Sequence, residues 1–443
     1  MATTAPALAG VQTGTTELRK RLLFVLFALL VYRIGTHIPV PGIDPVALQR
    51  LFDQQQGGIL DLFNMFSGGA LERMSILALG VMPYITSSII MNLLTMMYPR
   101  LNQLRKEGES GRRKITKLTR YGTLIIAIVQ GVALTSTLIA QGLPFEGSSL
   151  FGFFFIALVT LVTGALFMMW LGEKITEHGV GNGISLLIFA GIVSGFPAAI
   201  AGAFELARDR TIHMSVLLVI LVVAIGLVGF VVFIERGERR ITIHYAKRQQ
   251  GRRMVQGQTS HLPFKVNMAG VIPAIFASSL LLAPASMSQW FGQNEGLGFL
   301  QEISLILSPG QPLYILLFAA GIIFFSFFYT AIVRDPKELA DNLKRQGAYI
   351  QGIRPGQQTA DHIDDITTKL TIFGSLYVTS VCLLPELMRW SFDVPLQLGG
   401  TALLIVVVVA MDFMSQVQAH LLSSNYAKLM EKSNLRNYSR RTR

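Results

Sequence analysis

The sequence lacks the motifs that mark ATP-driven motors and hydrolytic enzymes. No GxxxxGKS or GxxxxGKT stretch is present to cradle a nucleotide phosphate, and no HExxH, CxxC or GxSxG arrangement occurs. The single cysteine, Cys382, excludes an internal disulfide framework and is typical of a small apolar packing residue. We therefore expect no catalysis, no bound cofactor and no metal ion.

Charge is also scarce, and long apolar runs take its place. Charged residues make up 14% of the 443 residues, against ~25% in soluble domains, while apolar residues make up 51%. Ten runs have about the ~20 residues that a membrane-spanning helix needs. The sequence predicts an all-α polytopic membrane protein with ten transmembrane helices, at 22–40, 75–97, 121–140, 151–172, 183–201, 214–234, 266–288, 312–333, 370–388 and 399–421.

Ionisable side chains are almost absent from these runs. Arg33 lies towards the outer end of the first, Glu173 and Lys174 lie where the fourth ends, and Asp412 lies towards the end of the last. Ion-coupled carriers normally keep ionisable groups near the middle of the membrane. The pattern therefore argues against proton or sodium coupling.

Basic residues, by contrast, gather on one side of the predicted bundle. Of the 38 lysines and arginines, 32 lie on the side that holds both termini, mostly in 100–120, 236–265, 334–369 and the C-terminal tail. By the positive-inside rule, both termini are cytoplasmic. We expect five basic cytoplasmic elements that face anionic partners, including anionic lipids.

Five predicted spans precede residue 210 and five follow it, so the second half enters the membrane from the opposite side. Such halves are typical of inverted repeats. The expected organisation is a flexible N-terminal tail (1–21), an N-terminal half (22–210), a C-terminal half with two basic loops (211–421) and a basic C-terminal tail (422–443). A channel and a small-solute carrier both fit this plan.

The segment 59–74, ILDLFNMFSGGALERM, is apolar but too short to span, and Gly68-Gly69 interrupts it. Inside a membrane bundle, such a segment must be buried in protein or line a cavity. The alternative is an interfacial helix that lies flat on the outer surface. Helix breaks are also predicted, at Pro83 in the second span and at Pro273 and Pro284 in the seventh.

The stretch 236–253, RGERRITIHYAKRQQGRR, has seven basic residues in eighteen, more than membrane orientation requires. It begins with β-branched alternation at 241–243 and continues as a helix-compatible run. We expect a folded protrusion that contacts ribosomal RNA phosphates or an acidic protein face.

Longer motifs then carry a resemblance to one family. They are FNMFSGGAL (63–71), EGESGRRKIT (107–116), GNGIS (181–185), HLPFKVNMAGVIPAIFASS (261–279) and GIRPG (352–356). In these motifs the chain resembles the SecY/Sec61-alpha family of protein-translocation channels, proteobacterial type.

The resemblance implies a clam-shell of two inverted five-helix halves in the bacterial inner membrane. It implies that segment 59–74 is a plug, and that a lateral gate opens where spans two and three meet spans seven and eight. The implied partners are the SecE and SecG subunits, the SecA ATPase, a translating ribosome, signal sequences, nascent polypeptides and membrane lipids.

The resemblance also assigns roles to individual residues. A hydrophobic pore ring would consist of Val81, Ile85, Ile188, Ile192, Ile275 and Ile405. The core of the plug would be Phe63, Asn64, Met65, Phe66, Ser67, Gly68 and Gly69, and polar gate residues would be Thr86, Gln130 and Asn267. SecA or ribosome docking would use Arg354, Arg236, Arg239, Arg240, Lys247, Arg248, Arg252, Arg253, Lys344 and Arg345.

Overall fold

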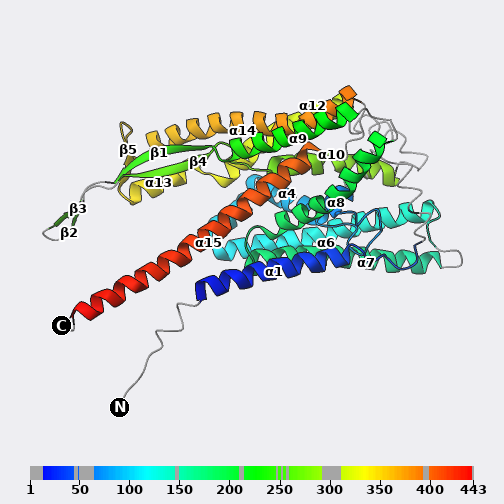
Figure 1. Cartoon of the computed structure of the whole chain (residues 1–443), viewed down its shortest axis with the longest axis horizontal. Helices are drawn as coiled ribbons and strands as arrows, with labels where there is room; N and C mark the ends of the chain where they lie inside the picture. Colours follow the sequence, from blue (N-terminus) through cyan, green and yellow to red (C-terminus); the bar gives the residue numbers. More distant parts are fainter. Residues whose placement is uncertain are drawn as a thin grey trace, which may run out of the picture.

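The computed structural model describes residues 13–43, 48, 64–144, 149–208, 214–245, 248–250, 253–255, 259–291, 311–392 and 399–441. Long helices lie side by side over most of its length (Figure 1). In the first half of the chain they are α1 (Thr13–Gly35), α4 (Met82–Met97), α6 (Glu109–Ala140), α7 (Leu150–His178) and α8 (Gly183–Arg208). The second half contributes α9 (Met214–Glu235), α10 (Ile272–Phe291), α12 (Pro312–Val333), α14 (Gln357–Phe392) and α15 (Gly400–Arg441).

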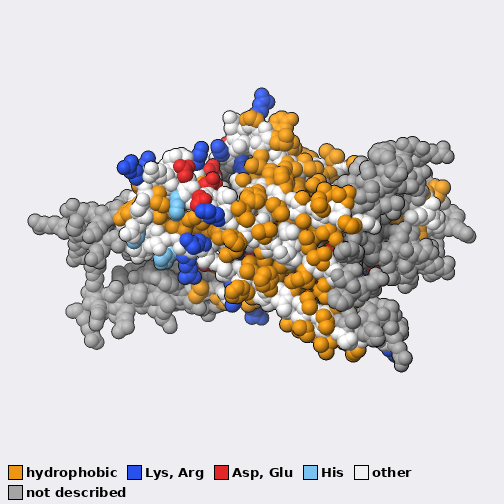
Figure 2. Space-filling view, turned by 90° about the horizontal axis from the view of Figure 1, so that it is seen from above, with side chains coloured by type: hydrophobic (Ala, Val, Ile, Leu, Met, Phe, Trp, Pro, Cys, Tyr) orange, Lys and Arg blue, Asp and Glu red, His pale blue; other side chains and the backbone are white. Residues whose placement is uncertain are grey.

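The outer surface of the bundle is apolar. Among the described residues, seven helices are long and apolar enough to cross a membrane, and α4 and Ile272–Leu281 are shorter apolar helices. In α9 the side chains of Leu218, Ile225 and Phe233 are more than half exposed. Figure 2 shows a broad belt of hydrophobic side chains around the middle of one face. Such a belt needs lipid or protein partners to cover it, and the predicted class, a helical multi-pass membrane protein, is confirmed, with a small sheet in addition.

Two predicted spans begin later than expected. The span predicted at 75–97 becomes helical only at Met82, and the span predicted at 266–288 only at Ile272. Pro83 and Pro273 therefore lie in the first turns of their helices and do not kink them. In a first turn the backbone N–H makes no intrahelical hydrogen bond, so proline, which lacks this N–H, is tolerated. Before α4, the chain turns and pairs with the end of the first predicted span, with Ile76 N donating to Ile38 O at 2.9 Å.

The two basic loops of the second half fold together. Strand β1 (Glu238–Tyr245) pairs with β4 (Thr259–Lys265) on one side and with β5 (Ala348–Ile350) on the other. The helix-compatible run expected after 241–243 is instead extended, with short paired strands β2 (Arg248–Gln250) and β3 (Arg253–Val255). We term the folded basic loops, 236–265 and 334–369, the protrusion. It lies at the same end of the molecule as both described termini, and we term this the basic end (Figure 1).

The sheet has its own small core beneath it. Phe264 is fully buried and packs with side chains of α13 (Pro336–Arg345) and of the first turns of α14, among them Leu343 and Ile363. The guanidinium of Arg334 lies 4.7 Å from the centre of the Phe264 ring, a cation–π contact. The basic loops are therefore a folded unit with a defined surface.

Helix packing brings the two halves of the chain together. Helices α4, α6, α7 and α8 pack in sequence on one side, and α10, α12, α14 and α15 do so on the other. Helix α10 also packs against α4 and α6, and α15 contacts α1, α8 and α9 (Figure 1). A seam thus runs between α10 and the pair α4–α6.

Candidate functional site

Six branched apolar side chains from four helices are buried in the largest hydrophobic core of the described bundle. Val81 caps α4, and one turn later Ile85 donates its backbone N–H to the Val81 carbonyl at 3.1 Å. All six side chains are buried and belong to one continuous hydrophobic cluster; the members from the other three helices are Ile188 and Ile192 on α8, Ile275 on α10 and Ile405 on α15. The six residues predicted for the ring are thus buried in the same core, and their arrangement as a ring stays a prediction.

A narrow passage lined by such side chains would have a clear physical consequence. Apolar side chains offer no hydrogen bonds to a water column, so a narrow apolar passage dewets and blocks ions when it is empty. Only van der Waals packing holds the branched side chains in place. They can therefore shift without breaking any specific polar contact.

The short interrupted segment is largely buried where the structure describes it, from residue 64 to residue 74, although Glu72 and Arg73 are exposed. Phe63 and the residues before it lie outside the described part of the chain. Phe66, Ala70 and Met74 are buried, and Phe66 belongs to the same cluster as the six ring residues. The chain here forms one helical turn and then reverses at Gly68 and Gly69, which have φ of 71° and 79°. In this part the segment does not lie flat on the surface.

Two consecutive side chains of α1 hold this segment, and one of them also contacts α8. Tyr32 Oη on α1 donates to the Ser67 carbonyl at 2.9 Å. Arg33 Nη1 donates both to the Gly68 carbonyl at 3.0 Å and to Ser194 Oγ on α8 at 3.1 Å. Sequence reasoning did not identify these partners. The available signal was Arg33 itself, because an arginine inside an apolar span needs a partner.

The three polar residues predicted for the seam are not joined to one another by a hydrogen bond. Thr86, half-buried on α4, donates to the Met82 carbonyl of its own helix at 3.1 Å, and Gln130 is half-buried on α6. Asn267 is buried before the start of α10 and donates to Glu235 Oε1 at 2.6 Å and to the Gly270 carbonyl at 3.1 Å. Asn267 therefore fixes a turn at the basic end, and Glu235 is a further site residue that sequence reasoning missed.

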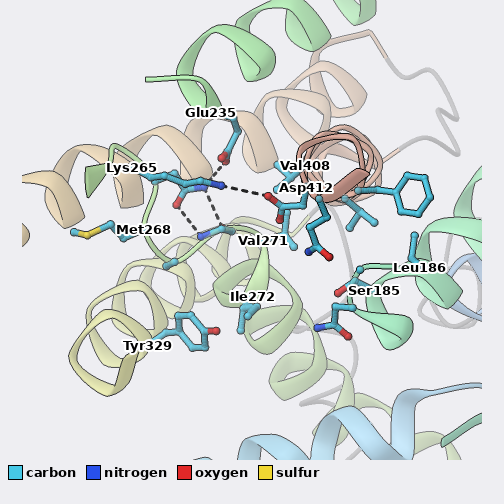
Figure 3. Close-up of a pocket in the computed structure, with 18 residues that line it drawn as sticks. Ser185, Leu186, Glu235, Lys265, Met268, Val271, Ile272, Tyr329, Val408 and Asp412 are labelled. Carbon is cyan, nitrogen blue, oxygen red and sulfur yellow. Dashed lines mark hydrogen bonds and ion pairs between the residues drawn. The ribbon is translucent and has the colours of Figure 1, made fainter. Parts of the chain in front are cut away.

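A cavity of about 220 Å³ opens next to this turn (Figure 3). Its polar side chains include Glu235, Asn267 and Lys265, and Lys265 Nζ forms an ion pair with Asp412 Oδ1 on α15 at 3.3 Å. Lining residues on α8 and α15, such as Leu186 and Val408, belong to the same hydrophobic cluster as the ring. The cavity, which we term the vestibule, therefore has both polar and apolar lining residues, and its apolar part is continuous with the buried cluster that holds the six residues.

The basic residues predicted for docking lie on the surface of the protrusion. Arg354 is exposed in the turn between β5 and α14, where Gly352 and Gly356 have φ of 83° and 114°, a region that favours glycine. The other exposed members are Arg236, Arg239, Arg240, Lys344 and Arg345. Lys247 and Arg252, and the side chains of Arg248 and Arg253, lie outside the described residues. Figure 2 shows lysines and arginines gathered at this end.

Comparison with known proteins gives one consistent result. A family profile described as SecY matches residues 75–414. The chain is 62% identical over 425 residues to the protein translocase subunit SecY of Pseudomonas aeruginosa, covering 96% of each chain. It is 57% identical over 434 residues to the protein of that name in Escherichia coli K12, covering 96% of this chain and 97% of the other. A solved structure described as "The structure of a protein conducting channel" aligns with 92% of this chain and 93% of its own, with a TM-score of 0.64 at 17% identity, and so shares the fold.

Proposed function

The chain belongs to the SecY family of protein translocase subunits, and from this premise we propose that it forms a protein-conducting channel. It moves unfolded secretory polypeptides across the bacterial inner membrane and releases the helices of membrane proteins sideways into the lipid. The observation that carries this proposal is one buried cluster that holds six apolar side chains from four helices together with Phe66 of the short interrupted segment. Membership of this family favours a channel over the small-solute carrier.

In this proposal, Val81, Ile85, Ile188, Ile192, Ile275 and Ile405 form the pore ring, and segment 59–74 is the plug. The basic end faces the cytoplasm, so a polypeptide enters through the vestibule beside Lys265 and Asp412. The two halves of the clam-shell are 22–210 and 211–421, with cytoplasmic tails at 1–21 and 422–443. The lining of the vestibule supports this direction, because Glu235, Lys265 and Asp412 can interact with a hydrated chain while its apolar residues belong to the same cluster as the proposed ring.

Sideways release would occur at the seam between α10 and the pair α4–α6, with α12 beside α10. Thr86 and Gln130 would face this lateral gate, and Asn267 would act at its cytoplasmic end. The guanidinium of Arg105, just beyond α4, donates to the Ile332 carbonyl at the end of α12. That contact joins the two halves across the seam at the basic end, which supports a closed seam there.

The exposed arginines and lysines of the protrusion would dock SecA or a translating ribosome, with Arg354 central to the contact. Their dense positive charge suits the phosphates of ribosomal RNA and acidic protein faces. SecE and SecG would flank the exposed apolar helices, and anionic lipids would meet the basic end at the membrane surface. No step requires a cofactor, because the motive force comes from the docked partner.

Crosslinking tests whether a polypeptide passes through the ring. A secretory precursor with a bulky folded tail is arrested during SecA-driven translocation. The channel carries a single introduced cysteine, either Ile275→Cys or Leu218→Cys, in a Cys382→Ala background that removes the native cysteine. We expect the precursor to crosslink at position 275. Position 218, which is exposed on the apolar surface of α9, is the matched control. Equal crosslinking at both positions would contradict passage through the ring.

A further inference from the structure

Arg33 is a half-buried charged residue one turn from the end of α1, in a span that is otherwise apolar. An ionisable side chain at such a place is unfavourable unless it has partners. The Arg33 guanidinium has two of them, in two different parts of the chain. It donates to the Gly68 carbonyl of the plug and to Ser194 Oγ of α8, and Ser194 in turn donates to the Gly191 carbonyl at 2.7 Å.

Tyr32 makes a second connection next to the first. Its hydroxyl is buried and donates to the Ser67 carbonyl, so two consecutive plug carbonyls are held by two consecutive residues of α1. The plug backbone at Gly68 lies very close to α1 and α8. A Cβ on Gly68 would lie 2.7 Å from Tyr32 Oη and 2.9 Å from Gly191 Cα. The contact therefore depends on the plug backbone and on a glycine, and it does not use plug side chains.

We propose that Tyr32 and Arg33 are positioning residues that clasp the plug, and that Arg33 couples the plug to α8. This inference rests on the proposed function, since it presupposes that segment 59–74 is the plug. Helix α8 also contributes Ile188 and Ile192 to the ring. If α8 moves outward to widen the ring, Arg33 must give up either Ser194 or Gly68. Ring widening and plug release are thereby linked through one guanidinium.

The test measures plug exposure directly. Ala70 is fully buried in the plug, so Ala70→Cys in a Cys382→Ala background should be protected from a membrane-impermeant maleimide added to the outer face of spheroplasts. Arg33→Gln should raise the labelling rate by roughly ten- to a hundredfold, the range for hydrogen bonds to charged groups. Tyr32→Phe, which removes only the hydroxyl, should raise it about three- to tenfold.

Conservative variants separate clasping from general stability. Arg33→Lys keeps the charge but not the planar fork, so it should restore part of the protection. Ser194→Ala removes only the α8 contact, so its effect should be smaller than that of Arg33→Gln. Arg208→Gln and Tyr121→Phe, at exposed positions, are matched controls that should label as the parent does. Ile322→Cys on α12, also fully buried, reports on loosening of the whole bundle.

Three outcomes overturn the proposal. Unchanged labelling at Ala70→Cys in Arg33→Gln and Tyr32→Phe shows that neither residue holds the plug. A parallel rise at Ile322→Cys shows a general loss of folding. The third outcome concerns the proposed function as well: if deletion of residues 60–70 leaves the resting channel silent to ions, the segment is no plug. If the deletion leaks and the labelling of Ala70→Cys is unchanged, the proposed role of Tyr32 and Arg33 is rejected but the assignment of the plug is not.

Discussion

The amide of Asn267 donates a hydrogen bond of 2.6 Å to the carboxylate of Glu235, which joins the end of α9 to the turn that begins α10. The same Asn267 side chain also accepts from Gly270 N at 3.1 Å, so it organises the turn as well. Both residues belong to the second half of the chain. We therefore propose that Asn267 acts on the gate by fixing where α10 starts, rather than by pairing with Thr86 or Gln130 across the seam.

This arrangement predicts that Asn267→Leu is disruptive. The substitution leaves the Glu235 carboxylate buried without its partner, which costs roughly 1.5–3 kcal/mol. Because α10 is one wall of the seam, we expect the closed state to lose stability and export of a reporter with a weakened signal sequence to rise. Glu235→Gln, which keeps an acceptor, should behave more nearly as wild type. Unchanged export in Asn267→Leu, Thr86→Val and Gln130→Leu alike would show that these residues do not set the gate.

Charge reversal at the tip of the protrusion should stop the motor without unfolding the channel. We expect Arg354→Glu to abolish SecA-driven translocation into proteoliposomes while SecE and SecG still copurify, because Arg354 is exposed and its side chain is not part of the protrusion core. Lys337→Glu on α13 is the matched control, an exposed basic residue of the same protrusion. Normal translocation by Arg354→Glu would remove this residue from the docking contact.

Ribosome binding should depend steeply on salt. Basic side chains that contact RNA phosphates release counterions, so affinity falls as salt rises, with a slope set by the number of phosphates that are neutralised. Replacing Arg239 and Arg240 with glutamine should lower that slope by up to about one for each arginine that pairs with a phosphate. Binding is measured by cosedimentation at several salt concentrations. A salt-independent affinity would indicate an interface that does not rest on phosphate charge.

The positions of the helices were predictable because about twenty apolar residues in sequence are a local signal. The starts of α4 and α10 were not, since Pro83 can either kink a helix or begin one, and the choice here depends on distant pairing of Ile76 with Ile38. The sheet was missed for a similar reason, because β1 and β5 lie about a hundred residues apart in the chain. Tyr32 and Glu235 have no motif of their own. Only tertiary contacts reveal what they bind.

The plug and the ring should seal the resting channel in series. Phe66 packs in the same hydrophobic cluster as Ile188 and Ile405, so ions would meet an apolar constriction and a packed segment together. Deleting residues 60–70 should raise resting conductance but leave translocation working, because nothing in that segment performs chemistry. Ile188→Asn combined with Ile405→Asn should also leak, since amides stabilise water in the constriction.

Single-channel currents from purified complexes in planar bilayers, without SecA or ribosomes, separate the two barriers. If both contribute, each variant leaks and the combination leaks more than either. A conservative double variant, Ile188→Val with Ile405→Val, keeps the constriction apolar and is the matched control, so it should stay silent. Silence from both the deletion and the double asparagine variant would contradict the seal, because the plug and the ring would then both be dispensable. A leak from the asparagine variant alone would place the seal in the ring, and the packing of Phe66 would then serve stability rather than closure.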